Sequence, residues 1–216
     1  MSKPIPHPRM FPHRERFVIE VAGDFAMFCQ TSAALNRVTY QIPTPSALRG
    51  MLKGVYHSNA LFPIPLRVEF LSPPRTVSVP QTMIRNSVIG YSRAIPADKT
   101  QRAPQGALYI QKPAYRITYE VRAMEAKKIR TLRRRLETGA SENPPYLGTR
   151  ECGVDITLPT DRPIQDDVYL IEPKMFVGNV YGMVEVRKGV VEYPEWTIEA
   201  LFTLRDQRME GHHAVL

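Results

Sequence analysis

The order in which strand-like and helix-like segments follow one another constrains the fold most. Residues 16–23 and 115–122 alternate apolar and polar side chains, as half-buried strands do. Residues 44–57 and 124–137 carry apolar side chains at helical spacing. With another alternating segment at 66–71, the order strand, helix, strand, strand, helix is typical of the split βαβ arrangement. The sequence therefore predicts an α+β fold with a ferredoxin-like, RRM-type core.

The first predicted helix has a clear beginning. Thr44 is suited to the N-cap, and Pro45 fits the first helical position. The apolar stripe that follows consists of Leu48, Met51, Leu52 and Val55. Because these residues are three or four apart, the helix is expected to bury this stripe against the sheet.

Three further expectations concern the segments around these elements. Residues 37–42 predict a second short strand, and residues 75–79 are expected to pair back onto 66–71. Residues 90–113 are mostly polar and predict a long loop of the kind that often carries function.

Beyond the second helix, short apolar runs predict a β-rich extension. The runs lie at 168–171, 183–186, 190–193 and 197–202. Lys188 and Gly189 stand between two of them and predict a hairpin turn. The expected organisation is a ferredoxin-like domain at 16–150, the extension at 151–204, and tails at 1–15 and 205–216.

Basic residues dominate the second predicted helix. Six of the nine residues from 127 to 135 are Lys or Arg, and the whole chain carries a net charge of +8. Lys127, Arg130 and Arg134 share one face of the helix. Such a face attracts a phosphate backbone, although the alternative is an ordinary solvated helix surface. The charge balance favours a polyanionic partner such as a nucleic acid.

Several function classes lack their sequence signatures. The chain has no P-loop, no Rossmann glycine pattern, no HExxH and no GxSxG. Its two cysteines, Cys29 and Cys152, have no paired spacing, and four of its five histidines stand near the ends of the sequence. No metal and no cofactor are therefore expected. Without a long apolar run or a signal-peptide pattern, the expected location is the cytoplasm and no membrane contact is expected.

Tyr56 stands one turn after Leu52, at the edge of the apolar stripe. The plainest interpretation is a core aromatic residue whose hydroxyl finds a partner. The alternative is a phenol beside a lysine. Such a pair could take a proton from a ribose 2′-hydroxyl and stabilise charge on the neighbouring phosphate, leaving a 2′,3′-cyclic phosphate without a metal.

Separated segments of the chain resemble one known family. They lie at 21–28, 38–50, 100–102, 133–135, 145–151 and, more weakly, 184–191. The family is the family-five RAMP subunit of subtype I-C CRISPR systems. The resemblance implies a ferredoxin-like domain with a β-rich extension, and metal-independent cleavage of precursor CRISPR RNA at the base of the repeat hairpin. It also implies retention of the 5′ handle, assembly with the backbone and large subunits of the Cascade surveillance complex, and access to target DNA through that complex.

The resemblance also implies site residues. Tyr56 matches the family's tyrosine on the first helix, and Lys127 matches its lysine near the start of the second. The family's histidine is absent, and Lys128 stands in its place. Because lysine is protonated at neutral pH, Lys127 and Lys128 are expected to stabilise charge, and Tyr56 is expected to accept the proton. His57 is a weak substitute, since adjacent helical positions do not share a face.

Two alternatives to a nuclease stay open. One is a non-catalytic subunit that caps the 5′ handle, which the missing histidine favours. The other is a generic RRM-like RNA binder, although no RNP-like segment surrounds Tyr115 and Tyr119. In each case basic side chains are expected to contact the RNA, and the candidates are Arg49, Lys53, Arg102, Arg130, Arg134 and Arg150.

Overall fold

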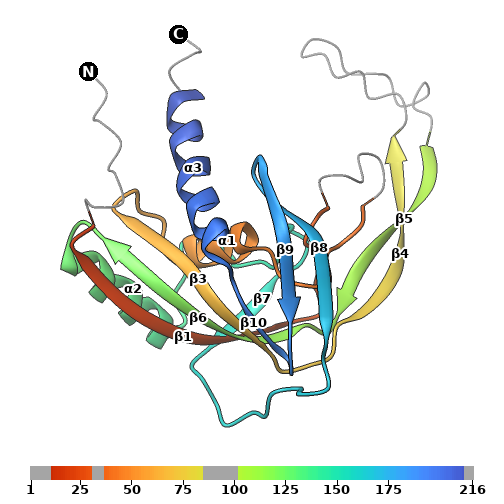
Figure 1. Cartoon of the computed structure of the whole chain (residues 1–216), viewed down its shortest axis with the longest axis horizontal. Helices are drawn as coiled ribbons and strands as arrows, with labels where there is room; N and C mark the ends of the chain where they lie inside the picture. The colour runs from red at the N-terminus through yellow and green to blue at the C-terminus, as the bar shows by residue number, and fades with distance from the viewer. Residues whose placement is uncertain (1–10, 31–36, 85–101, 212–216) are drawn as a thin grey trace.

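The computed structural model of the chain describes residues 11–30, 37–84 and 102–211, and within these it describes only the backbone of 81–84, 102–105 and 204–211. A five-stranded antiparallel sheet forms its centre, in the order β10-β3-β6-β1-β7 (Figure 1). The strands and the two helices packed on them are β1 (His13–Gly23), α1 (Pro45–Val55), β3 (Leu61–Phe70), β6 (Ala114–Ala123), α2 (Ala126–Thr138), β7 (Val154–Thr157) and β10 (Val190–Glu192). Without β10, this is the strand order of a split βαβ unit. The predicted ferredoxin-like, α+β fold is confirmed.

Both helices cover the same face of this sheet. The apolar stripe of α1 is buried together with Ile129, Leu132 and Leu136 of α2. On β6, alternate side chains from Tyr115 to Ala123 face this core. The hydroxyl of Tyr119 is satisfied there, because it donates to the carbonyl oxygen of Leu48 at 3.0 Å. The alternation seen in the sequence thus fixes which side of the sheet receives the helices.

The start of α1 and the end of α2 follow the capping rules. The side chain of Thr44 accepts a hydrogen bond from the backbone of Ala47, and Pro45 occupies the first turn. Helix α1 ends at Val55, with Tyr56 as its C-cap in an extended conformation. Helix α2 ends at Thr138, with Gly139 as its C-cap, whose φ of 69° suits glycine. The predicted helices therefore end within two residues of the expected positions.

A second, smaller sheet corrects two predictions. It contains β2 (Phe25–Ala26), β5 (Arg102–Gln111) and β4 (Arg75–Ile84), and its β4–β5 hairpin extends away from the main sheet (Figure 1). Residues 75–79 thus pair with β5 and not with 66–71. In the predicted loop at 90–113, residues 102–111 form strand β5, and 90–101 lie outside the described residues. The sequence did not predict this strand because it contains Pro104 and Gly106, and both residue types are rare inside strands.

The prediction of a strand at 37–42 is also wrong. Within this segment the described residues form a single isolated bridge between Thr39 and Cys29. Tyr40 and Ile42 are nevertheless buried. Their apolar spacing therefore reflects burial of an irregular segment and not a strand. Periodicity over six residues does not separate these two cases.

The C-terminal part contains a two-stranded ribbon, a turn and a helix. Strands β8 (Leu170–Val177) and β9 (Val180–Val186) pair with each other. Lys188 and Gly189, with φ values of 50° and 70°, turn the chain between β9 and β10, so the predicted hairpin turn is confirmed. Residues 197–202 are helical and not a strand, since α3 spans Glu195–Gly211. The segment from 205, expected as a tail, continues this helix.

Helix α3 begins directly after Pro194, where Thr197 caps the turn through hydrogen bonds to the Pro194 carbonyl. Its first turns pack against the start of β3, and the ring of Phe202 stacks on that of Phe62 with 4.0 Å between the ring centroids. This packing favours a helix at 197–202, although the local sequence pattern also suits a strand.

The predicted division of the chain at residue 150 stays a prediction. Strands β7 and β10 come from the chain beyond 150 and form the two edges of the five-stranded sheet. At the other end, β1 begins at His13, inside the segment expected as a tail. No helix within the described parts of the chain has the length and apolar character needed to cross a membrane.

Candidate active site

Tyr56 stands where α1 ends and α2 passes beside it. Its backbone N–H closes the last turn of α1 by bonding the carbonyl oxygen of Leu52 at 3.2 Å. Its half-buried ring has two cations near it: Lys128 Nζ lies 5.9 Å from the ring centroid and Arg135 Cζ lies 4.8 Å from it. The structure therefore brings Tyr56 and Lys128 together, two residues that are 72 positions apart in the sequence.

Lys127 lies at the exposed start of α2. Its Nζ bonds Oε2 of Glu125 at 2.7 Å. This bond and the charge of the same carboxylate raise the pKa of Lys127, and the phenol of Tyr56 adds a smaller effect in the same direction. Lys127 is therefore held as a cation that interacts with Tyr56 through space. Such a group can stabilise negative charge but is poorly suited to accept a proton.

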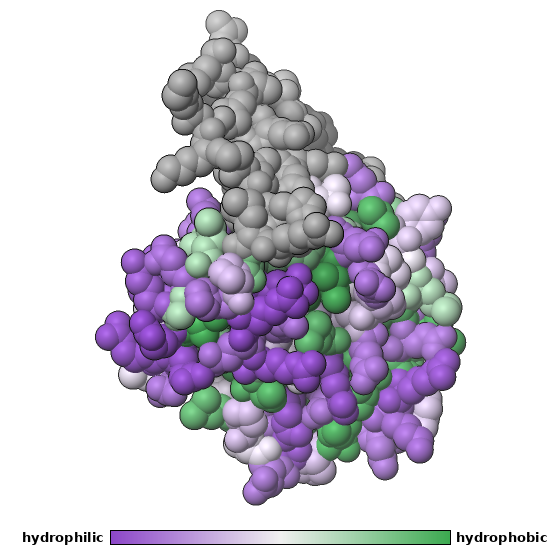
Figure 2. Space-filling model, turned by 60° about the vertical axis from the view of Figure 1, so that its left-hand side comes forward, coloured by the Kyte–Doolittle hydropathy of each residue, from purple (hydrophilic) through white to green (hydrophobic). Residues whose placement is uncertain are grey.

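The exposed face of α2 carries a basic stripe, by which we mean Lys127, Arg130 and Arg134. All three side chains are exposed, and in the described part of the chain neither arginine of the stripe has an ion-pair partner. Arg133, on a neighbouring face, instead pairs with Glu15 of β1. Figure 2 turns the side carrying α2 toward the viewer, and its surface there is mostly hydrophilic. The stripe thus places positive charge at the surface of the helix that passes Tyr56.

The other predicted RNA contacts have different positions. Lys53 is half-buried in the last turn of α1, and Arg150 is exposed in the loop after α2. Arg102 is the first residue of β5, and its side chain lies outside the described residues. Contacts of these three residues with RNA stay predictions.

Arg49, also predicted to contact RNA, has a buried position. Its side chain is only 7% exposed, and Nη1 donates to the carbonyl oxygen of Leu201 at 2.7 Å. Its guanidinium also lies 4.1 Å from the ring centroid of Phe62. Arg49 therefore ties α1 to β3 and α3, and its contact with RNA stays a prediction that this burial does not support.

Sequence reasoning missed Arg135 and Glu142 as members of this cluster. Arg135 Nη1 donates to the carbonyl oxygen of Val55 at 2.9 Å, and Nη2 lies 3.0 Å from Oε1 of Glu142. Glu142 Oε2 in turn accepts the backbone N–H of His57 at 2.9 Å. The available signal was helical spacing, since Arg135 follows Lys128 by seven residues and so shares its face. Nothing in the local sequence marks Glu142.

A pocket of about 390 Å³ opens beside this cluster. Val55 and Arg135 belong to its wall, together with the loop after α2 and the edge strand β7. The other lining residues are Leu136, Gly139, Ala140, Ser141, Pro145, Val154, Asp155, Ile156 and Thr157. The cluster around Tyr56 is thus next to open space and is not sealed in the core.

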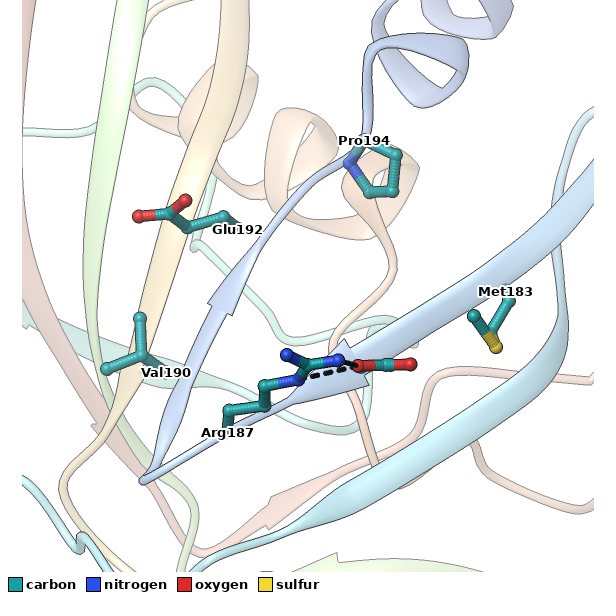
Figure 3. Close-up of a pocket in the computed structure, with 6 residues that line it drawn as sticks. Met183, Arg187, Val190, Glu192 and Pro194 are labelled. Carbon is teal, nitrogen blue, oxygen red and sulfur yellow. Dashed lines mark hydrogen bonds and ion pairs between the residues drawn. The ribbon is translucent and has the colours of Figure 1, made fainter.

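A second pocket, of about 450 Å³, lies on different elements (Figure 3). Residues of β9 and β10 line it, and the basic side chain in its wall, Arg187, pairs with Glu185 at 2.6 Å. This pocket shares no residue with the Tyr56 cluster, and the charge of its arginine is already balanced.

Comparisons with known proteins agree on one family. The family model described as CRISPR-associated protein (Cas_Cas5) matches residues 17–175. A protein of Thermus thermophilus named CRISPR pre-crRNA endoribonuclease Cas5d is 29% identical over 235 residues, which cover 91% of this chain and 99% of that protein. A protein of the same name from Mannheimia succiniciproducens is 28% identical over 168 residues, covering 68% of this chain and 73% of its own.

The fold is similar to solved structures as well. A crystal structure described as that of a CRISPR-associated protein matches with a TM-score of 0.61 at 17% identity, covering 84% of this chain and 93% of its own. At that identity the likeness concerns the fold alone. The family match spans β1 to β8 and includes Tyr56, Lys127 and Lys128. The chain therefore belongs to the Cas5 family of CRISPR-associated proteins, and within it to the Cas5d group expected in subtype I-C.

Proposed function

We propose that this chain cleaves precursor CRISPR RNA at the base of the repeat hairpin, without a metal ion, and stays bound to the 5′ handle. The observation that carries the proposal is the cluster at Tyr56, where Lys128 and Arg135 lie within 6 Å of the phenol ring beside an exposed basic stripe. The curated relatives are named as pre-crRNA endoribonucleases, which supports the same activity here.

In the proposed reaction, Tyr56 acts as a phenolate and accepts the proton of a ribose 2′-hydroxyl, which leaves Tyr56 as a neutral phenol. The 2′ oxygen attacks the adjacent phosphorus, and the bond from phosphorus to the 5′ oxygen breaks. The products are a 2′,3′-cyclic phosphate and a 5′-hydroxyl, the leaving oxygen taking a proton from water. Lys127 and Lys128 supply positive charge to the phosphorane, which carries more negative charge than the ground state.

The basic stripe gives the RNA a second point of attachment. A phosphate backbone along Lys127, Arg130 and Arg134 would release counterions, so binding would persist after the cut. We further propose that the chain with its bound 5′ handle joins the backbone and large subunits of Cascade and reaches target DNA through that complex. Residues 16–150 would supply the RNA-processing domain and 151–204 an extension for partner contacts.

A second candidate function is a cap of the 5′ handle without cleavage. Two observations favour it: Lys128 stands where the family has histidine, and Lys127 is already bound by Glu125. Both would weaken proton transfer and leave RNA binding intact.

The deciding experiment incubates the purified chain with repeat hairpin RNA in excess EDTA and resolves the products on a denaturing gel. The variants are Tyr56→Phe and Lys127→Ala, with Tyr169→Phe as the matched control, since Tyr169 is a well-exposed tyrosine just before β8. We expect one cut near the hairpin base, lost in Tyr56→Phe, strongly slowed in Lys127→Ala and unchanged in the control.

Two further samples test the chemistry. RNA with a single 2′-deoxy nucleotide at the cut should not be cleaved, and mass spectrometry of the natural product should find a 2′,3′-cyclic phosphate. Tight binding with no cut in any sample would favour the cap. A cut that survives Tyr56→Phe would remove Tyr56 from its proposed role.

A further inference from the structure

The end of α1 is completed by another part of the chain. The last carbonyl groups of a helix lack partners within it. Here the Val55 carbonyl accepts from Arg135 Nη1 at 2.9 Å and from the backbone N–H of Glu142 at 3.2 Å. The Gly54 carbonyl accepts from the N–H of Asn143 at 3.0 Å. Helix α2 and the loop after it therefore hold the end of α1 in place.

The side chain of Glu142 continues this arrangement past Tyr56. One carboxylate oxygen lies 3.0 Å from Arg135 Nη2, and the other accepts the N–H of His57 at 2.9 Å. Val55 and His57 are the two chain neighbours of Tyr56. The Arg135–Glu142 bracket, as we call this ion pair, thus holds the backbone on both sides of the tyrosine.

The same bracket contacts the tyrosine ring. The Arg135 guanidinium lies 4.8 Å from the ring centroid, a cation–π distance. The side chains of Arg135 and Glu142 are 25% and 33% exposed, so solvent screens the pair less than a surface ion pair. One arginine therefore restrains both the backbone entering Tyr56 and the plane of its ring.

We infer that the Arg135–Glu142 bracket positions Tyr56 for proton transfer, which makes Arg135 a positioning residue. The inference rests on the proposed cleavage. Arg135 is tied by its two terminal nitrogens to Val55 and Glu142, and its guanidinium lies over the Tyr56 ring, so the role inferred here is exerted through Tyr56. A phenol that must reach one particular 2′-hydroxyl depends on placement to within about 1 Å, and such an error costs roughly 100-fold in rate.

The test measures single-turnover cleavage by Arg135→Ala, Glu142→Ala and the double variant. Arg133→Ala is the matched control, because Arg133 is on the same helix and makes an ion pair, with Glu15, away from Tyr56. We expect the maximal rate to fall roughly 10- to 100-fold in each bracket variant, with half-saturating protein concentration within about threefold of the parent. The double variant should be no slower than the slower single variant, because each change breaks the same Arg135–Glu142 ion pair.

A second measurement does not depend on activity. With 3-fluorotyrosine at position 56, the ¹⁹F chemical shift should move in Arg135→Ala and Glu142→Ala and stay in place in Arg133→Ala. Arg135→Lys and Glu142→Gln, which are gentler changes, guard against loss of folding and should give smaller shifts in the same direction.

The outcomes separate this inference from the proposed function. If the parent chain cleaves RNA and the bracket variants cleave at the parent rate with an unchanged ¹⁹F shift, the bracket does not position Tyr56 although the nuclease stands. If the parent chain does not cleave, the nuclease fails, and the ¹⁹F shift alone decides whether the bracket holds the tyrosine. Equal losses in Arg133→Ala would assign the effect to α2 as a whole and overturn the inference.

Discussion

At the scale of single residues, Glu20 of β1 is a buried carboxylate that joins β6 and the segment after β7. Its side chain is 8% exposed and meets Arg116 of β6 at 2.7 Å. Thr160 donates to it through both its backbone N–H, at 3.0 Å, and its hydroxyl, at 2.8 Å. Burial alone would raise the pKa of Glu20, but the bonds from Thr160 and Arg116 hold it below the usual value. The ionised form is therefore built into the fold, and it fixes the segment after β7 to the sheet.

The lowered pKa gives a stability prediction with a definite sign. Because the folded pKa of Glu20 lies below the unfolded one, the stabilisation is present above the unfolded pKa and is lost as pH falls through the folded value. Glu20→Gln should lower the free energy of unfolding at pH 7 by about 2 kcal/mol, since it removes the charged acceptor of the bonds from Arg116 and Thr160, although Glu69 still pairs with Arg116 at 2.9 Å. Urea unfolding at pH 7 and in acid should show the difference between variant and parent shrinking in acid. Glu192→Gln, an exposed carboxylate 4.0 Å from Arg67, is the control and should change little. A constant difference at both pH values would contradict the assignment.

Residue-level prediction worked where the signal was local. Thr44, Pro45 and Gly189 could be read from the sequence because caps and turns depend on a few neighbouring residues. Arg49 could not, because its burial depends on Phe62 and Leu201, and the second of these is 152 residues away. Glu142 was missed for the same reason, since its partners belong to other elements, α2 and the end of α1.

At the scale of elements, α2 has three working faces. One buries Ile129, Leu132 and Leu136, a second presents Lys128 and Arg135 to Tyr56, and the third carries the basic stripe. The period of 3.6 residues was enough to predict the buried face and the stripe. The helical period did not predict which face of α2 lies beside Tyr56, since that depends on where α1 ends.

The basic stripe can be tested apart from cleavage. Replacing Arg130 and Arg134 together by Gln should weaken binding of repeat RNA, and the slope of log affinity against log salt should fall by about one unit for each phosphate that is no longer neutralised. Fluorescence anisotropy across a salt series measures both. Arg133→Gln, whose charge is already paired with Glu15, should change the slope less. An unchanged slope in the double variant would mean that the stripe is only a solvated surface.

At the scale of the whole molecule, strand order was predictable and the C-terminal helix was not. The order β1, α1, β3, β6 and α2 follows from alternation, apolar stripes and the split βαβ rule, whereas β5 was expected as a loop and β7 was not expected. The sequence of α3 shows little amphipathic periodicity, so it did not predict a helix. The first turns of α3 pack on Phe62 and Ile64 of β3, and its later turns extend away from the sheet (Figure 1). Tertiary packing, and not local preference, decided its form.

Arg49 links α1 to β3 and α3, and its removal should lower stability without changing RNA affinity. Arg49→Ala leaves the Leu201 carbonyl without its donor and exposes the Phe62 ring, which should cost about 2 kcal/mol or more in the free energy of unfolding. Urea unfolding gives the stability, and anisotropy at a concentration of confirmed folded protein gives the affinity. A large loss of affinity in a folded variant would mean that Arg49 does contact RNA.

The register of the central strands has a consequence for synthesis. His13 at the start of β1 pairs with Ala123 at the end of β6, and the other neighbour of β1 is the later strand β7. During translation, therefore, β1 has no strand of the main sheet beside it until more than half of the chain has left the ribosome. Strand β1, an internal strand of the finished sheet, therefore waits longest for a partner, and until β6 is made the nascent chain must keep β1 from pairing with strands of other molecules.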